Sequence, residues 1–192
     1  MTDIEDLARR AARGDRDAFH DLVEATRTSL FQLAWRILRN YHDAEDVLQE
    51  VYIKAHRGLP DWRGHAKVQT WLYRIAVNAC LDRTRGTKAT TISIDNEEER
   101  HWEPADPHPA NDPQRGLDAR ELREQVDVAL MGLTPTERAI FNLRHERELA
   151  LKEIAAVLDR SEGMVKNLLF RGMHKLRARL AHLREEPQRR IS

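Results

Sequence analysis

The stretch LKEIAAVLDRSEGMVKNLLFRGMHKLRARL, residues 151–180, decides the fold of the C-terminal part of the chain. Apolar residues recur at helical spacing on both sides of a short polar break, and Ser161 stands where the second helix needs an N-cap. A short helix, a tight turn and a long helix together make a helix-turn-helix motif. The pattern therefore predicts that motif, with the second helix as the element that enters a DNA groove.

The second helix of this motif has one apolar face and one polar face. Lys and Arg on the polar face can neutralise phosphates, and Asn can pair with adenine in the major groove. The helix N-terminus adds a favourable phosphate contact. The predicted duplex-binding residues are Ser161, Lys166, Asn167, Phe170, Arg171, His174 and Lys175. The alternative is a solvated basic helix on a bundle.

The charge of the chain is unevenly distributed, although the net charge is zero. Residues 1–86 carry a net charge of +1, residues 87–113 carry −5 and residues 114–192 carry +4. From Gly163 to Arg184 there are six Lys or Arg residues and no Asp or Glu. Because nucleic acid is the usual partner of a basic stripe, this distribution favours the DNA-binding interpretation of the helix.

Composition limits the class of protein. Of the 192 residues, 41% are hydrophobic and 33% are charged, which is typical of a soluble, helix-rich protein. No apolar run approaches the ~20 residues that span a bilayer, and the N-terminus has no apolar signal-peptide core. We therefore expect a cytoplasmic protein without membrane insertion. The single cysteine, Cys80, excludes an internal disulfide and a multi-cysteine zinc site.

The rest of the chain also favours helices. Helical periodicity runs from an N-cap at Asp15 or Asp17 to Leu38, and again from Asp43, the expected N-cap of a helix over 43–57. A Gly- and Pro-containing loop covers 57–65. The motif TPTE at 134–137 is a capping box that starts a helix through Arg147. We predict an all-α fold with two small helical domains, 1–86 and 117–192, joined by a flexible acidic, Pro-rich linker at 87–116.

The helix predicted over 68–85 has aromatic and basic residues on the side away from its apolar stripe. Bases can stack on aromatic rings while Lys and Arg hold the backbone of a single strand. The candidate single-strand contacts, in the helix and the preceding loop, are Trp62, Arg63, His65, Lys67, Trp71, Arg74, Asn78 and Arg85. The alternative is that Trp71 belongs to the core and Arg74 pairs with a nearby carboxylate. The residues alone leave both interpretations open.

The helix predicted over 43–57 has a mixed outer face that includes Asp43, Asp46, Glu50 and Ile53. Such a face is either solvated or the docking site of a protein partner. We find no catalytic motif in the chain: there is no P-loop, no GxGxxG, no GxSxG and no HExxH. We therefore expect no enzyme activity, no cofactor and no metal centre. A hydrolase or a metal-dependent enzyme is a more distant alternative.

The ordered set of motifs resembles the group 4, or extracytoplasmic-function (ECF), sigma factors of bacterial RNA polymerase over about residues 5–183. In the first domain the resemblance rests on DAEDVLQEVYIKAHR (43–57) and WRGHAKVQTWLYRIAVNACLDRTR (62–85). In the second it rests on LTPTERAIFNLR (133–144) and KEIAAVLDRSEGMVKNLLFRGMHKLR (152–177). Departures from the family pattern include Trp62 in place of Phe, and Met164 in place of a Thr at the start of the last helix.

The resemblance implies a role for each segment. The 43–57 helix is expected to dock on the β′ clamp helices of core polymerase, through Asp43, Asp46, Gln49, Glu50 and Ile53. Residues 62–85 are expected to open the −10 element and capture its non-template strand, and the helix-turn-helix to read the −35 duplex and meet the β flap. The acidic linker would thread toward the active centre, and an anti-sigma factor is the expected inhibitor. A stand-alone helix-turn-helix regulator, which binds a palindrome without polymerase, is the alternative.

Overall fold

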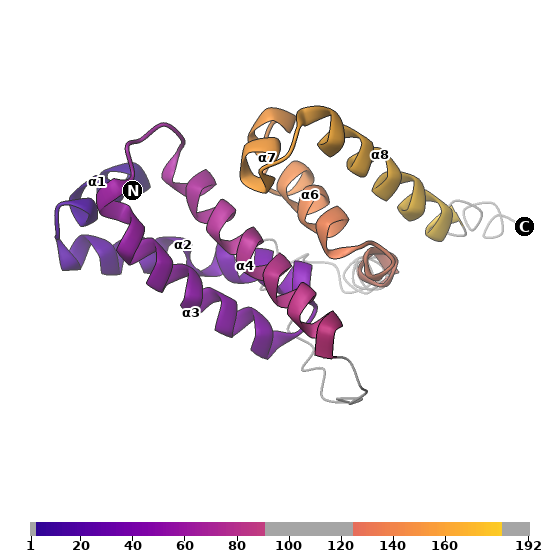
Figure 1. Cartoon of the computed structure of the whole chain (residues 1–192), viewed down its shortest axis with the longest axis horizontal. Helices are drawn as coiled ribbons and strands as arrows, with labels where there is room; N and C mark the ends of the chain where they lie inside the picture. The colour runs from indigo at the N-terminus through magenta and orange to yellow at the C-terminus, as the bar shows by residue number, and fades with distance from the viewer. Residues whose placement is uncertain (1–2, 91–124, 182–192) are drawn as a thin grey trace, which may run out of the picture.

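The computed structural model describes residues 3–90 and 125–181, with the side chains of 87–90 left out (Figure 1). Every regular element in these two segments is a helix, which confirms the predicted all-α class. The predicted linker at 87–116 lies mostly outside the described residues. The helix before it runs on to Thr90, four residues into the predicted linker.

The N-terminal segment forms four α-helices and one short 3-10 turn. They are α1 (Ile4–Ala12), α2 (Arg16–Leu38), α3 (Tyr41–Gly58), η1 (Leu59–Asp61) and α4 (Val68–Thr90). Asp15 caps α2 by accepting the N–H of Ala18 at 3.0 Å. The prediction that Asp43 caps α3 is wrong: Asn40 is the cap, and its side chain accepts the N–H of Asp43 at 2.9 Å. The predicted 57–65 loop is shorter, because α3 and η1 occupy its first half.

The apolar stripes of α2, α3 and α4 face one another and form the main core. Leu22, Leu33, Val47, Val51 and Leu72 are each at most 1% exposed. Burial of one such side chain contributes roughly 1.5–3 kcal/mol, so this core dominates the stability of the segment. Helix α1 is also linked to α4 by a hydrogen bond. The Glu5 carboxylate accepts the N–H of Val68 at 2.7 Å, which satisfies a backbone donor at the start of α4.

The C-terminal segment contains the predicted helix-turn-helix. Residues 125–131 are helical, and they are followed by α6 (Pro135–His145), α7 (Leu151–Leu158) and α8 (Glu162–Arg179). The capping box is confirmed, with Thr134 as the cap, Pro135 at the first helical position and Glu137 bonded back to Thr134. The α7–α8 turn uses Asp159 in the left-handed conformation, at φ 52°, and Ser161 as the cap of α8.

The two segments pack directly on each other. Helix α7 contacts α4, and α6 contacts both α2 and α4, so that α6 and α7 lie alongside the first helical bundle (Figure 1). Ile140, Ile154 and Val157 of the second segment belong to the same buried cluster as Tyr73 and Val77 of α4. Within the described residues, no helix has the length and apolarity that a membrane span requires.

Candidate nucleic-acid interface

Helix α8 exposes most of the residues predicted to contact duplex DNA. Packing of Val165, Gly172 and Leu176 against the rest of the domain buries the opposite face. The Phe170 ring is 70% exposed, which is unusual for an aromatic side chain that is not in contact with a partner. Ser161 is exposed but structural as well, because its hydroxyl accepts the N–H of Met164 at 3.3 Å. The exposed residues of the predicted set are Ser161, Lys166, Asn167, Phe170, Arg171 and His174.

Lys175 differs from the other predicted DNA contacts on α8. Its ammonium group donates to both carboxylate oxygens of Glu137, at 2.9 and 2.7 Å. Glu137 is 3% exposed. Although burial opposes ionisation of Glu137, the bonds from Lys175 and Thr134 bring its pKa below the ordinary value. The Lys175 side chain therefore pairs with α6, and we leave it out of the proposed DNA-binding set.

We expect Lys175→Met to destabilise the C-terminal segment by about 1–3 kcal/mol at pH 7, because it leaves a buried carboxylate without its cation. A depressed folded-state pKa contributes stability above the unfolded pKa, and this contribution is lost as pH falls through the folded value. The difference between variant and parent should therefore shrink toward pH 4. Urea unfolding at several pH values measures this difference in the free energy of unfolding. Lys166→Met, an exposed change on the same helix, is the control. An equal loss of unfolding free energy in both variants would contradict the account.

The outer side of α4 carries the candidate single-strand contacts. Arg74, Asn78 and Arg85 are exposed along one side of the helix, and the loop before the helix exposes Arg63, His65 and Lys67. Arg85 donates to Asp82 at 3.0 Å, but both side chains are about two-thirds exposed, so solvent weakens this pair. Among the described residues, Arg74 forms no ion pair. The strip is therefore basic and accessible. These exposed residues of α4 and the loop are called the −10 strip, after the role that the family resemblance predicts for them.

Trp71 and Trp62 have a mixed environment. Both are half-buried and pack against the main core. Trp71 lies over Gly58, where an added Cβ would stand 3.1 Å from its ring. The Trp71 ring therefore packs against the end of α3, and only part of the ring is accessible to a nucleic acid. The Nε1 atom of Trp62 is buried without a hydrogen-bond partner among the described residues.

Helix α3 exposes part of the predicted protein-docking face. Gln49 and Asp46 are exposed, and Ile53 is 54% exposed. Glu50 pairs with Lys54 on the same helix. Asp43 is partly covered, because Arg83 of α4 donates to Asp43 and to Asp46, each at 2.7 Å. The structure thus adds Arg83, which the sequence did not single out, as the residue that holds this acidic edge in place.

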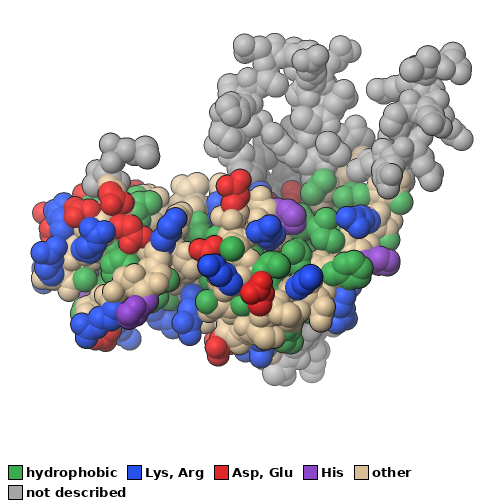
Figure 2. Space-filling model, turned by 90° about the horizontal axis from the view of Figure 1, so that it is seen from above, with side chains coloured by type: hydrophobic (Ala, Val, Ile, Leu, Met, Phe, Trp, Pro, Cys, Tyr) green, Lys and Arg blue, Asp and Glu red, His purple; other side chains and the backbone are tan. Residues whose placement is uncertain are grey.

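The face of the molecule seen in Figure 2 mixes charges. Figure 2 shows Lys and Arg side chains spread over the visible face, among acidic and apolar ones, rather than gathered in one patch. The basic character that matters for nucleic acid is therefore local to α8 and to the −10 strip. The sequence also missed the arginines between the two segments, among them Arg147. A basic residue in a short interhelical turn gave no signal that it would contact another domain.

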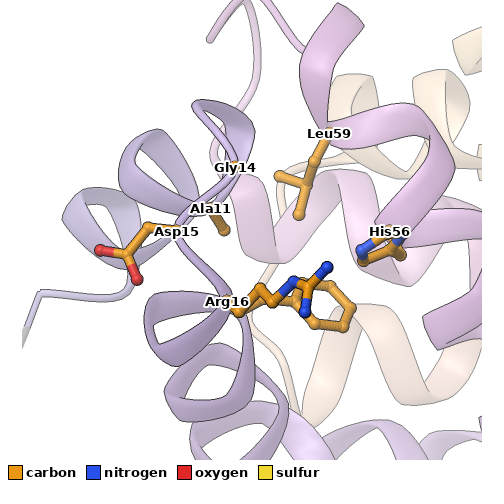
Figure 3. Close-up of a pocket in the computed structure, with 7 residues that line it drawn as sticks. Ala11, Gly14, Asp15, Arg16, His56 and Leu59 are labelled. Atoms are coloured by element: carbon orange, nitrogen blue, oxygen red, sulfur yellow. The ribbon is translucent and has the colours of Figure 1, made fainter.

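One recess lies at the junction of α1, α2 and the end of α3, with a volume of about 480 Å³. It is lined by Ala11, Gly14, Asp15, Arg16, Phe19, His56 and Leu59. Figure 3 shows the Asp15 carboxylate pointing away from the recess. That carboxylate caps α2 and binds Arg10, and these two contacts lower its pKa. The recess therefore lacks an acid and a base that point at one another.

Comparison with known proteins extends these observations. Residues 22–90 match the family model described as Sigma-70 region 2, and residues 129–178 match Sigma-70, region 4. ECF RNA polymerase sigma factor SigW of Bacillus subtilis (strain 168) is 31% identical, over 94% of this chain and 98% of its own length. ECF RNA polymerase sigma factor SigM of Mycobacterium tuberculosis (strain ATCC 25618 / H37Rv) is 36% identical, over 95% of this chain and 84% of its own length.

Two solved structures share the fold. CnrH in complex with the cytosolic domain of CnrY has a TM-score of 0.63 at 24% identity, covering 94% of this chain and 99% of that one. The sigma factor RpoE in complex with the anti-sigma factor NepR, from Bartonella quintana, has a TM-score of 0.66 at 17% identity. That match covers 85% of this chain and 96% of the other.

Proposed function

Because the chain belongs to the ECF sigma factors of bacterial RNA polymerase, we propose that it binds core polymerase and directs initiation at promoters with −10 and −35 elements. The observation that carries this proposal is the presence of two separate exposed basic surfaces in one chain. One is the outer face of a helix-turn-helix recognition helix, and the other is a strip with amide, guanidinium and aromatic groups. The first suits duplex DNA and the second suits an unpaired strand.

The residue roles follow the matched regions. The −10 strip, with the edges of Trp62 and Trp71, captures the melted non-template strand. Lys166, Asn167, Phe170, Arg171 and His174, with the N-terminus of α8 at Ser161, read the −35 duplex. We keep the division into a first domain, an acidic linker and a second domain, but place the end of the first domain at Thr90, where α4 ends.

Protein partners are assigned to two further surfaces. The exposed part of α3, around Gln49 and Ile53, docks on the β′ clamp helices, and the second domain meets the β flap. An anti-sigma factor is the proposed inhibitor. This is supported by one of the solved structures of the same fold, in which the sigma factor RpoE is in complex with the anti-sigma factor NepR. The chain would then act in the cytoplasm, where the polymerase transcribes the chromosome.

The proposed role needs no catalytic residue in this chain, since the polymerase forms the phosphodiester bonds. In the described residues, no three His, Cys, Asp or Glu side chains are grouped so as to hold a metal ion. The lining of the recess near Asp15 likewise offers no acid–base pair. The sigma-factor relatives are the basis for proposing a binding protein.

The experiment that tests this function compares two mixtures. The purified chain is combined with promoter DNA alone, and with promoter DNA plus sigma-free core polymerase. We expect a complex with core and specific, salt-resistant promoter binding only in the second mixture. Specific binding to a palindromic duplex in the first mixture, with no complex with core, would instead favour a stand-alone regulator.

A narrower prediction concerns Phe170. An exposed apolar side chain beside Asn167 and Arg171 is suited to contact the C5-methyl group of thymine in the major groove. We expect that changing one −35 thymine to uracil, which removes only that methyl group, weakens holoenzyme binding by about fourfold, the equivalent of ~0.8 kcal/mol. In Phe170→Ala the same replacement should have no effect. Equilibrium binding to a set of singly substituted duplexes measures this.

The control for Phe170 is Met131→Ala, which removes a 46% exposed apolar side chain outside α8. It should keep the full thymine-to-uracil effect. If Phe170→Ala is still as sensitive to uracil as the parent at every position, the thymine contact is wrong. Phe170 would then be assigned to a protein partner.

A further inference from the structure

The helix that carries the −10 strip has no N-cap in its own stretch of sequence. Helix α4 begins at Val68, and the Trp71 N–H donates to the carbonyl oxygen of Lys67 at 3.0 Å, which puts Lys67 at the cap position. A lysine side chain has three N–H donors and no acceptor, so it cannot satisfy the free N–H groups of the first turn. Residues 63–67 include no Ser, Thr, Asp or Asn that would do so. The start of α4 therefore depends on an acceptor from elsewhere.

Glu5 of α1 supplies that acceptor. Its carboxylate accepts the Val68 N–H at 2.7 Å, although the two residues are 63 positions apart. The negative charge also complements the partial positive charge of a helix N-terminus. By contrast, α1, α2, α3, α6 and α8 are capped by the side chain that precedes each of them, namely Asp3, Asp15, Asn40, Thr134 and Ser161. The cap of α4 is thus a contact between two helices and not a local motif.

Helix α1 is held in place on both sides of the loop that precedes α4. Leu7 and Ala8 of α1 are at most 2% exposed and belong to the main core. Helix α1 contacts η1, where the loop 62–67 begins, and α4, where that loop ends (Figure 1). A bond from α1 to the first N–H of α4 therefore fixes one end of the loop relative to the other.

The loop itself has few constraints of its own. Arg63, His65 and Lys67 are exposed, and Gly64 has a φ of 74°, a left-handed conformation that favours glycine. Ordering such a segment at the moment of binding costs free energy, and a segment that is ordered beforehand avoids part of that cost. The direction in which the chain enters α4 sets where Lys67 and its neighbours lie. The Glu5 carboxylate fixes that direction through the Val68 N–H.

We propose that Glu5 is a positioning residue for capture of the unpaired strand, because its bond to Val68 orders the loop 62–67 and the first turn of α4 before DNA binds. Glu5 does not touch the strand, since a carboxylate repels phosphates. It also lies outside the region 2 match, which begins at residue 22, so the family model covers neither Glu5 nor α1. The inference rests on the proposed function, because it takes the loop to be part of the −10 strip.

A different role for the same carboxylate predicts the opposite effect. A helix N-terminus beside basic residues attracts phosphate, and a carboxylate bound there would compete with DNA. Removing Glu5 would then strengthen capture of the strand, whereas removing a positioning residue weakens it. The direction of the change in affinity therefore distinguishes the two roles.

The first measurement tests the cap in the full-length chain without polymerase. Amide hydrogen exchange is followed at Val68 and in the first turn of α4. We expect Glu5→Ala to speed this exchange by about threefold to tenfold, and Glu5→Gln, which keeps an acceptor oxygen, to speed it less. Asp15→Ala is the matched control, because it removes a capping carboxylate from α2 and leaves the bond between Glu5 and Val68 in place. It should leave exchange at Val68 unchanged.

The second measurement tests the consequence in the holoenzyme. The probe is a promoter fragment recovered with the parent chain, with its −10 bases mismatched so that melting is not required. We expect Glu5→Ala and the shorter Glu5→Asp to weaken binding of this probe by about threefold to tenfold, and Glu5→Gln by at most about twofold. Asp15→Ala should bind as the parent does. Binding to core polymerase should stay within about twofold of the parent in every variant.

Combined substitutions show whether Glu5 acts through the loop. In a chain that already carries Arg63→Met and Lys67→Met, adding Glu5→Ala should weaken probe binding by no more than about twofold, because the side chains that Glu5 positions are absent. In a chain that carries Arg171→Met on α8, adding Glu5→Ala should have its full effect. A general loss of stability would instead weaken binding equally in both backgrounds.

The outcomes separate the positioning role from the proposed function. Unchanged exchange at Val68 in Glu5→Ala would overturn the inference, since the bond would not order α4. Faster exchange with unchanged or tighter probe binding would also overturn it, and normal core binding would leave the proposed function intact. If no form of the chain, the parent included, binds core polymerase, the proposed function fails and the positioning role fails with it.

Discussion

Replacing Asn78 by Ala is expected to reduce formation of the open promoter complex about tenfold to hundredfold, while binding to core polymerase changes by no more than about twofold. Asn78 is exposed on α4, between Arg74 and Arg85, so its amide can reach the edge of an unpaired base. Loss of one such base contact costs about 1–3 kcal/mol. An exposed substitution away from the partner surface usually changes stability by at most ~0.5 kcal/mol.

The measurement is the rate at which the −10 bases become reactive to a single-strand probe in the holoenzyme complex. Arg27→Ala on α2, outside the −10 strip, is the control. On a template whose −10 region is already mismatched, melting is no longer required, but complex formation should still be weakened because the contact with the unpaired base is lost there too. Asn78 would be removed from the −10 strip if the variant lost core affinity and opening in equal measure.

Replacing Ile53 by Glu is expected to weaken binding to core polymerase by about 30-fold or more. Ile53 is the one large apolar side chain of α3, a fully described helix, that is strongly exposed, at 54%. An apolar anchor buried at the centre of an interface commonly contributes 2 kcal/mol or more. A carboxylate at that position would be buried without a partner, beside Glu50, which adds repulsion to the lost contact.

Fluorescence titration of core polymerase with labelled chain measures this effect. Ala25→Glu, at an exposed position of α2, introduces the same charge away from the docking face and should retain nearly full affinity. Unfolding of both variants should match the parent, since neither position is in the core. If Ile53→Glu and the parent bind core polymerase with equal affinity, the docking surface does not include this part of α3.

The sequence predicts most of the helices because each has its own periodicity and cap. The outer face of α8 is a clear case: residues two or five positions from a buried Val165 or Leu176 must lie toward the opposite side, and Asn167, Phe170, Arg171 and His174 do. Helix α1 was missed, since it is short and only Leu7 and Ala8 of it are buried. The cap of α3 was misplaced because Asn40 and Asp43 are both good caps, and only the backbone of residues 38–41 distinguishes them.

Contacts between elements far apart in the chain were not predictable in the same way. Lys175 has the sequence signature of a DNA contact, yet its partner is Glu137, 38 residues earlier. Arg83 and Arg147 likewise reach partners on other helices. The contact of α6 and α7 with α2 and α4 joins two amphipathic units that each satisfy their own pattern. No periodicity in either unit specifies that α7 will pack on the side of α4 that carries Tyr73 and Val77.

The most direct test of the central claim is transcription by sigma-free core polymerase supplied with this chain and a library of randomised upstream DNA, followed by sequencing of the transcripts. We expect transcripts that start at defined positions, from templates enriched in two short sequence blocks at a constant spacing. The account would be contradicted if the chain produced no specific start above the background of core polymerase alone.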